Sequence, residues 1–104
     1  MTPGEVTVSF EYRRHVGPRY VHGSVTLQFA FSTGFQFKTQ AIWPRGEDYT
    51  SAVERAVREV LANQGVLDCT SCTLVCIDWD EVASCAAGFE AAARAATRGA
   101  FEAG

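Results

Sequence analysis

Long apolar runs are missing from this sequence, and so is a basic leader. No run of apolar residues approaches the roughly 18 that a membrane-spanning helix needs. The segment Met1–Glu5 has no basic part followed by an apolar part, which a secretory signal would show. We therefore expect no membrane span, no signal peptide and a cytoplasmic location.

Positive charge is also scarce. The chain has 9 Lys and Arg against 12 Asp and Glu, which gives a formal net charge of −3 at pH 7. Proteins that bind nucleic acid non-specifically are usually basic, because most of their affinity comes from displacing counterions from phosphates. This balance argues against RNA binding by the whole surface and leaves room only for a local basic site.

Two catalytic signatures are absent as well. No Gly-x-x-x-x-Gly-Lys-Ser/Thr segment occurs, which excludes the phosphate-binding loop of a GTPase or ATPase. Ser51, Ser71 and Ser84 lack the flanking pattern of a nucleophile elbow, so the sequence does not indicate a hydrolase. We expect a non-enzymatic protein without a cofactor.

The composition itself is that of one globular domain spanning residues 1–104. Of its residues, 47% are hydrophobic and 20% charged, which is ordinary for a folded domain. A chain of this length buries roughly 65% of the surface of its unfolded form, enough for a core without disulfides. No repeat or linker is visible.

Three segments in the first half alternate between apolar and polar residues, as half-buried strands do. They cover residues 5–15, 20–31 and 35–43. Turn residues separate them at 16–18 and 32–34. The pattern predicts three consecutive strands linked by hairpins, with one apolar face that needs a cover.

The second half of the sequence is predicted to form the helices that cover this apolar face. Ser51 and Glu54 have capping-box spacing, and Gly65 marks the end of an amphipathic helix. The run from Cys72 to Ile77 predicts a strand. Ser84 is the expected N-cap of an alanine-rich helix that Phe89 anchors. The prediction is an α+β fold in the order βββαβα, a four-stranded, largely antiparallel sheet with both helices on one face.

The second half also resembles a known family. Gly46-Glu47-Asp48-Tyr49, Ala52-Val53, the corner Trp79–Cys85 and the alanine-rich helix are similar to domain IV of elongation factor G, which tetracycline-resistance ribosomal protection proteins share. The family corner reads Tyr-His-Asp-Val-Asp-Ser-Ser; here Asp80 replaces its histidine and Ala83 its second acid. The resemblance implies a fold like the second domain of ribosomal protein S5, with a left-handed crossover around the first helix. It also implies a ribosome-facing end that includes Asp80. Because the phosphate-binding loop is missing, we expect a stand-alone domain of this type without the GTPase of the resembled factor.

The predicted first hairpin concentrates the basic residues that could contact a ribosome or structured RNA. Around Gly17 and Pro18 lie Arg13, Arg14, His15, Arg19 and His22. Arginines there could bind phosphates, and Tyr12 or Tyr20 could stack on a base. The alternative is an ordinary hairpin whose charges face solvent.

Other residues offer further sites. Cys69 and Cys72 have the spacing of half a zinc site or a redox pair, although no second half follows; buried apolar cysteines are the alternative. On the expected strand, Cys72 and Cys76 share a face with Leu74. The acids Asp78, Asp80 and Glu81 could hold a cation, or Glu81 could favour the following helix N-terminus.

A different class of function is a protein-interaction or self-associating module. An exposed edge strand, or exposed Trp43 and Trp79, would then form the interface with a protein partner or a second copy.

Overall fold

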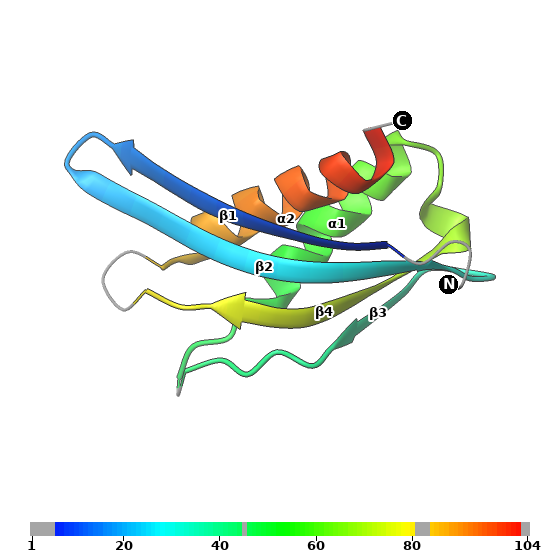
Figure 1. The fold of residues 1–104 in the computed structure, drawn as a ribbon, viewed down its shortest axis with the longest axis horizontal. Coiled ribbons are helices and arrows are strands. Elements are labelled where there is room, and N and C mark those ends of the chain that lie inside the picture. The colour runs from blue at the N-terminus through cyan, green and yellow to red at the C-terminus, as the bar shows by residue number, and fades with distance from the viewer. Residues whose placement is uncertain (1–5, 45, 81–83, 103–104) are drawn as a thin grey trace.

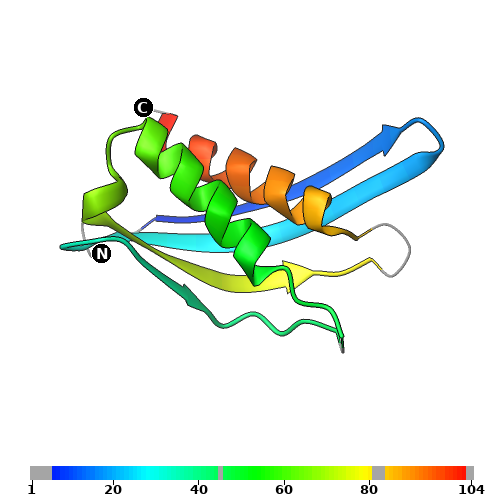
Figure 2. The ribbon, with the colours of Figure 1, turned by 180° about the vertical axis from the view of Figure 1, so that it is seen from behind.

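The computed structural model describes residues 6–44, 46–80 and 84–102. Four strands form one sheet and two helices lie on one of its faces (Figures 1 and 2). The elements, in chain order, are β1 Val6–Val16, β2 Arg19–Phe31, β3 Gln36–Thr39, α1 Thr50–Asn63, the 3-10 helix η1 Leu67–Cys69, β4 Thr70–Asp78 and α2 Ala86–Glu102. The prediction of an α+β fold with two helices over a four-stranded sheet is confirmed.

The order of strands in the sheet is β1-β2-β4-β3, which corrects the prediction of three hairpin-linked strands. β2 pairs antiparallel with β1 and β4, whereas β3 pairs parallel with β4. The apolar β4, with Cys72 and Leu74 buried, therefore lies inside the sheet between β2 and β3. The short β3 is exposed at three of its four residues and is suited to an edge.

The chain passes from β3 to β4 by way of α1, and the crossover is left-handed. In Figure 2 the helices lie in front of the sheet, α1 runs opposite to the two strands, and β4 lies between β3 and β2. When Figure 2 is rotated in the plane of the page until β3 and β4 point upward, β4 lies to the left of β3 and α1 remains in front of them. Connections between parallel strands are right-handed in about 98% of cases, so this hand is a distinctive property of the fold.

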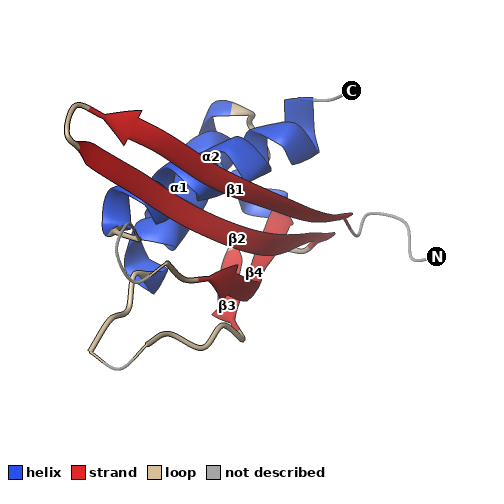
Figure 3. Cartoon of the chain, turned by 60° about the vertical axis from the view of Figure 1, so that its left-hand side comes forward, coloured by secondary structure: helices blue, strands red, loops and turns tan. Residues whose placement is uncertain are grey.

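The core lies between the sheet and the helices. In Figure 3 the two helices lie behind β1 and β2. Leu27, Phe29 and Leu74 from the sheet meet α1 and Phe89 of α2, all fully buried. Around Phe89 the rings of Trp43, Tyr49 and Trp79 pack with centroids 4.9 to 5.9 Å from the Phe89 ring. Both tryptophans are partly buried in this cluster, so they are not the exposed aromatic residues that the interaction hypothesis assumed.

Helix α1 begins at Thr50 without a capping box. Its N-cap residue is Tyr49 and makes no side-chain cap, while Ser51 lies exposed inside the first turn. Instead, the Asp48 carboxylate accepts the Thr50 N–H at 2.9 Å. The C-terminus follows the prediction, because Gly65 has φ +74° in the left-handed region. No helix in the described part of the chain is long and apolar enough to cross a membrane.

Candidate functional site

The first hairpin extends beyond the helices (Figures 1 and 2). β1 and β2 pair without interruption from Val6↔Phe29 to Val16↔Arg19, and the chain reverses at Gly17 (φ +61°) and Pro18. We call residues 13–22 the hairpin end. It contributes to the elongated shape of the molecule, which measures 42 × 27 × 23 Å.

The register divides the basic residues of the hairpin end between two faces. Successive residues of a strand point to opposite faces, so Arg13 and His15 share one face and Arg14 lies on the other. The His15 and Tyr20 rings pack together across the strands with centroids 4.7 Å apart. Arg19 is opposite Val16 in the register, but its side chain lies outside the described part of the structure.

His22 is the exception among the predicted basic residues, because its side chain is only 3% exposed. Its Nε2 lies 2.9 Å from Glu11 Oε2 and its Nδ1 lies 3.0 Å from Ser84 Oγ. A carboxylate only accepts hydrogen bonds, so in the neutral ring Nε2–H donates to Glu11, and Nδ1 accepts the Ser84 hydroxyl. His22 is thus a buried polar link and not a member of an exposed basic cluster.

The hydrogen bonds of His22 continue at both ends. Ser84 Oγ accepts the Asp80 N–H at 2.8 Å, and Glu11 Oε2 accepts from Arg13 Nη2 at 2.8 Å. The interactions of Glu11, first with His22 and then with Arg13, lower the pKa of its carboxyl. We call Glu11, His22 and Ser84 the polar relay; it joins β1, β2 and the segment that precedes α2.

Ser84 therefore has a different role from the predicted N-cap. Helix α2 begins two residues later, at Ala86, and the Phe89 N–H bonds to the Cys85 carbonyl at 3.1 Å. The Ser84 hydroxyl is used by Asp80 and His22 instead. Sequence reasoning missed the relay, since no spacing along the chain signals a contact between residues 22 and 84.

Beside the relay, the backbones of β2 and α2 touch. A Cβ atom at Gly23 would overlap the backbone of Gly88, and a Cβ at Gly88 would overlap the His22 carbonyl. The Cys85 N–H reaches the same carbonyl at 3.4 Å. Two glycines without Cβ atoms allow this approach, which fixes the start of α2 against the base of the hairpin end.

Asp80 lies beside the polar relay, near the hairpin end. Its backbone carbonyl accepts the Ser84 N–H at 2.9 Å, and its side chain is partly buried. Glu11, by its hydrogen bond and charge, is the main cause of the raised pKa of Arg13, and Asp80 adds a smaller contribution of the same sign. Glu81 and Ala83 of the predicted corner lie outside the described residues.

In the described part of the chain, no group of three or more His, Cys, Asp and Glu side chains is arranged to hold a metal ion. Burial raises the pKa of the Cys72 thiol to about 12, which disfavours the thiolate that metal binding or nucleophilic chemistry needs. Cys69 Sγ contacts the Val66 carbonyl at 3.4 Å. Cys76 is exposed and does not share a face with Cys72, because Val75 is an extra residue in the ladder with β2 and reverses the alternation after it.

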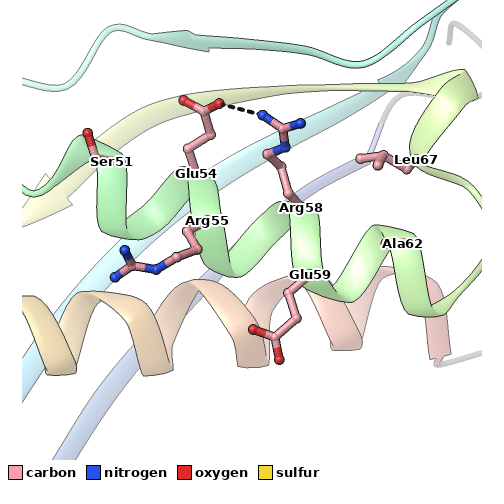
Figure 4. Close-up of a pocket in the computed structure, with 7 residues that line it drawn as sticks. All are labelled: Ser51, Glu54, Arg55, Arg58, Glu59, Ala62 and Leu67. Carbon is pink, nitrogen blue, oxygen red and sulfur yellow. Dashed lines mark ion pairs between the residues drawn. The ribbon is translucent and has the colours of Figure 1, made fainter.

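A surface hollow of about 610 Å³ lies along the outer side of α1 (Figure 4). Its charges are paired: Glu54 lies 3.5 Å from Arg58, Arg55 3.0 Å from Glu90, and Glu59 3.1 Å from Arg94. The Arg58 guanidinium also covers the Phe35 ring at 5.3 Å. This surface therefore offers a ligand few unsatisfied groups.

A second hollow, of about 320 Å³, lies at the end of the sheet opposite the hairpin end. Val6, Phe29, Phe31 and Phe101 contribute to its largely apolar lining. Phe31 is 78% exposed there. The two ends of the sheet thus differ in character, one basic and the other apolar.

These features define a two-layer α+β domain with a mixed sheet and a left-handed crossover. Among solved structures, the chain is similar to the protein ttk003000868 from Thermus thermophilus, with a TM-score of 0.77 and 22% sequence identity over 90% of this chain. The match covers 15% of that protein's length, so this chain corresponds to a small part of it. At 22% sequence identity, this similarity establishes that the two share a fold and nothing further. No protein-family model and no curated protein matches the chain.

Proposed function

We propose that this chain is a non-enzymatic domain related to translation factors, which associates with the ribosome or a structured RNA. The contact surface is the hairpin end together with the neighbouring segment at Asp80. The observation that carries the proposal is that the hairpin end extends beyond the helices and that Arg13, Arg14 and His15 within it are exposed. A projecting basic ribbon can reach phosphates that the rest of an acidic surface would repel.

The fold supports the proposed relationship to elongation factor G domain IV. That resemblance implies an S5-type arrangement with a left-handed crossover, and this rare hand is present around α1. The structural match is to a small part of a longer chain, so a domain of this fold also occurs inside a larger protein. A shared fold does not transfer a function, so the binding role rests on the hairpin end.

The mechanism is shape fitting combined with a few phosphate contacts. Arg13 is 57% exposed and Glu11 holds its guanidinium from one side, so it is oriented but still accessible. Arg14 is exposed, and no ion pair to it is recorded among the described residues. Arg19 at the turn supplies the third charge in the proposal. The relay orients this ribbon relative to Asp80.

The test is co-sedimentation with ribosomes. Replacing Arg13, Arg14 and Arg19 with alanine should abolish association, because each lost phosphate contact also removes counterion release. A matched control replaces Lys38, Arg55 and Arg58, which removes the same charge from β3 and α1 and should leave association intact. Unchanged sedimentation of the hairpin variant would refute the proposal.

Self-association is the second candidate, and β1 favours it. This eleven-residue strand is at the edge of the sheet, and its apolar side chains Val6 and Phe10 are 43% and 40% exposed. Long apolar edges tend to pair with another strand. Light scattering should then show a dimer that Phe10→Lys disrupts; a monomer at high concentration would exclude this candidate.

A further inference from the structure

The hairpin end differs from an ordinary basic patch because it carries cations on both faces. Arg13 points to the face away from the helices, with His15 and Tyr20, whereas the register puts Arg14 on the opposite face. A flat phosphate surface would engage only one of these arginines. Two phosphate strands, one on either side of the ribbon, would engage both.

The size of the hairpin end fits such a partner. From the pair Arg13↔His22, where the ribbon is fixed to the segment before α2, to the last pair, Val16↔Arg19, is three residues along the strand, or about 10 Å at roughly 3.3 Å per residue. A two-stranded ribbon can enter a groove as wide as the B-form major groove, about 12 Å wide and about 8.5 Å deep. The free part of the ribbon is therefore long enough to reach the floor of the groove.

The aromatic residues favour a groove over a single strand. Proteins that hold single strands offer exposed ring faces on which bases stack. Here the Tyr20 ring is half-buried and packs at 36° to the His15 ring, 4.7 Å away, so neither ring is isolated. The ribbon is also held at its base by the relay and the Gly23–Gly88 contact, which suits insertion as a rigid body.

We propose that the hairpin end inserts into an open major groove of a double-helical nucleic acid, with Arg13 and Arg14 contacting phosphates of opposite strands. This inference rests on the proposed function and names the form of nucleic acid that it requires. The major groove of regular A-form RNA is too narrow and deep to admit side chains. The groove must therefore belong to an RNA helix opened by a bulge or to B-form DNA, which present the same two phosphate walls.

The experiment measures fluorescence anisotropy of the full chain with four probes: a bulged RNA duplex, the same duplex without its bulge, a B-form DNA duplex and the RNA single strand. We expect the bulged RNA and the DNA to bind at least about tenfold more tightly than the other two. If bulged RNA alone binds tightly, the groove belongs to an opened RNA helix, and the result supports both the inference and the proposed function. If DNA alone does, the groove belongs to B-form DNA; this supports insertion into a groove but contradicts the proposed association with ribosome or RNA.

Single-arginine variants test the two-faced contact. Arg13→Ala and Arg14→Ala should each weaken binding about five- to tenfold and lower the salt dependence by about one ion, whereas Lys38→Ala should change neither. Arg14→Lys should recover much of the affinity. The inference would be overturned if the RNA single strand bound as tightly as the bulged RNA and the DNA. It would also be overturned if the binding affinity depended on only one of the two arginines.

The two proposals fail in distinguishable ways. If ribosome association depends on the three arginines but all four probes bind equally, the proposed function stands and the groove inference is wrong. If the chain binds neither ribosomes nor any of the four probes, the proposed function is wrong, and the inference that rests on it is wrong as well. Equal binding to poly-glutamate and the duplexes would also overturn the inference, because an acidic protein would then suffice.

Discussion

Helix α2 is held to the sheet in two regions that use different physics. At its start, backbone contact between Gly23 and Gly88 and the polar relay leave almost no freedom of position. From the next residue onward, Phe89 and a row of alanines pack on the apolar face of the sheet. In the first region, stability comes from hydrogen bonds and contacts between individual atoms in fixed directions. In the second, it comes from the volume of the packed side chains and the apolar area that they remove from water.

The difference explains which part of the molecule sets the hairpin end in place. Apolar packing stabilises the two layers but tolerates small shifts, since contact energy is spread over many atoms. Directional hydrogen bonds from His22 to β1 and to Ser84 tolerate little change. We therefore expect stability to depend most on the core, and the position of the hairpin end to depend most on the relay.

The largest effect should come from the apolar region. Phe89 is fully buried and contacts three other aromatic rings. Phe89→Ala should lower the free energy of unfolding by about 3–5 kcal/mol, while Phe89→Leu should cost less than half of that. Urea unfolding measures both. A loss of under about 1 kcal/mol for the alanine variant would contradict the role of Phe89 as the anchor of α2.

The second-largest effect should come from the backbone contact between Gly23 and Gly88. Gly23→Ala adds one methyl group that overlaps the Gly88 backbone. Neither backbone segment can move away without separating α2 from β2. We expect a loss of about 2–3 kcal/mol. Gly99→Ala is the matched control, because nothing lies within 4 Å of the added atom, and alanine in a helix should raise stability by about 0.5–1 kcal/mol. Equal effects of the two substitutions would disprove the close approach.

The hydroxyl of the relay should matter less. Ser84→Ala leaves His22 Nδ1 and the Asp80 N–H without their partner, which should cost about 1–2 kcal/mol. Ser9→Ala removes an exposed hydroxyl that contacts Thr26 at 2.9 Å and should cost under about 0.5 kcal/mol. Thermal unfolding of the two variants compares a buried link with an exposed one; a larger loss for Ser9→Ala would be inconsistent with the relay.

Local patterns in the sequence located several elements well, although the third strand, expected over 35–43, is only Gln36–Thr39. Alternation located β1 and β2 to within about a residue at each end, because a half-buried strand has a fixed period of two. Gly65 located the end of α1, because it supplies the left-handed residue there. In both cases the deciding physics lies within a few residues of the chain.

Long-range features escaped prediction for the same reason. Alternation states which face of β3 is apolar but not which strand lies beside it, so the parallel pairing with β4 was missed. The extra Val75 reversed the face of Cys76 without any mark in the sequence. His22 looked like part of a basic cluster, because only the fold brings Ser84 to it. The basic hairpin itself was visible, but its division into two faces needed the register.

The smallest expected effect is the pH dependence of the relay. The folded chain lowers the pKa of Glu11 below its ordinary value of 4.5, with the His22 hydrogen bond as the largest cause and Arg13 next. A carboxyl with a lowered folded-state pKa stabilises the protein above its unfolded pKa, and this stability is lost as the pH falls through the folded value. Acidification from about pH 5 should therefore weaken the contact between β1 and His22.

The Glu11 carboxyl resonance, followed by NMR during an acid titration, measures this shift directly. Arg13→Ala should move the pKa part of the way back toward 4.5, and His22→Ala should move it further, in the order of the two causes. Arg13 is exposed, so its variant keeps the fold and provides the internal reference. If Glu11 titrates at its ordinary value in the unaltered chain, the carboxylate does not hold His22. The polar relay would then lose its connection to β1, and only the bond between His22 and Ser84 would remain to join β2 to the segment before α2.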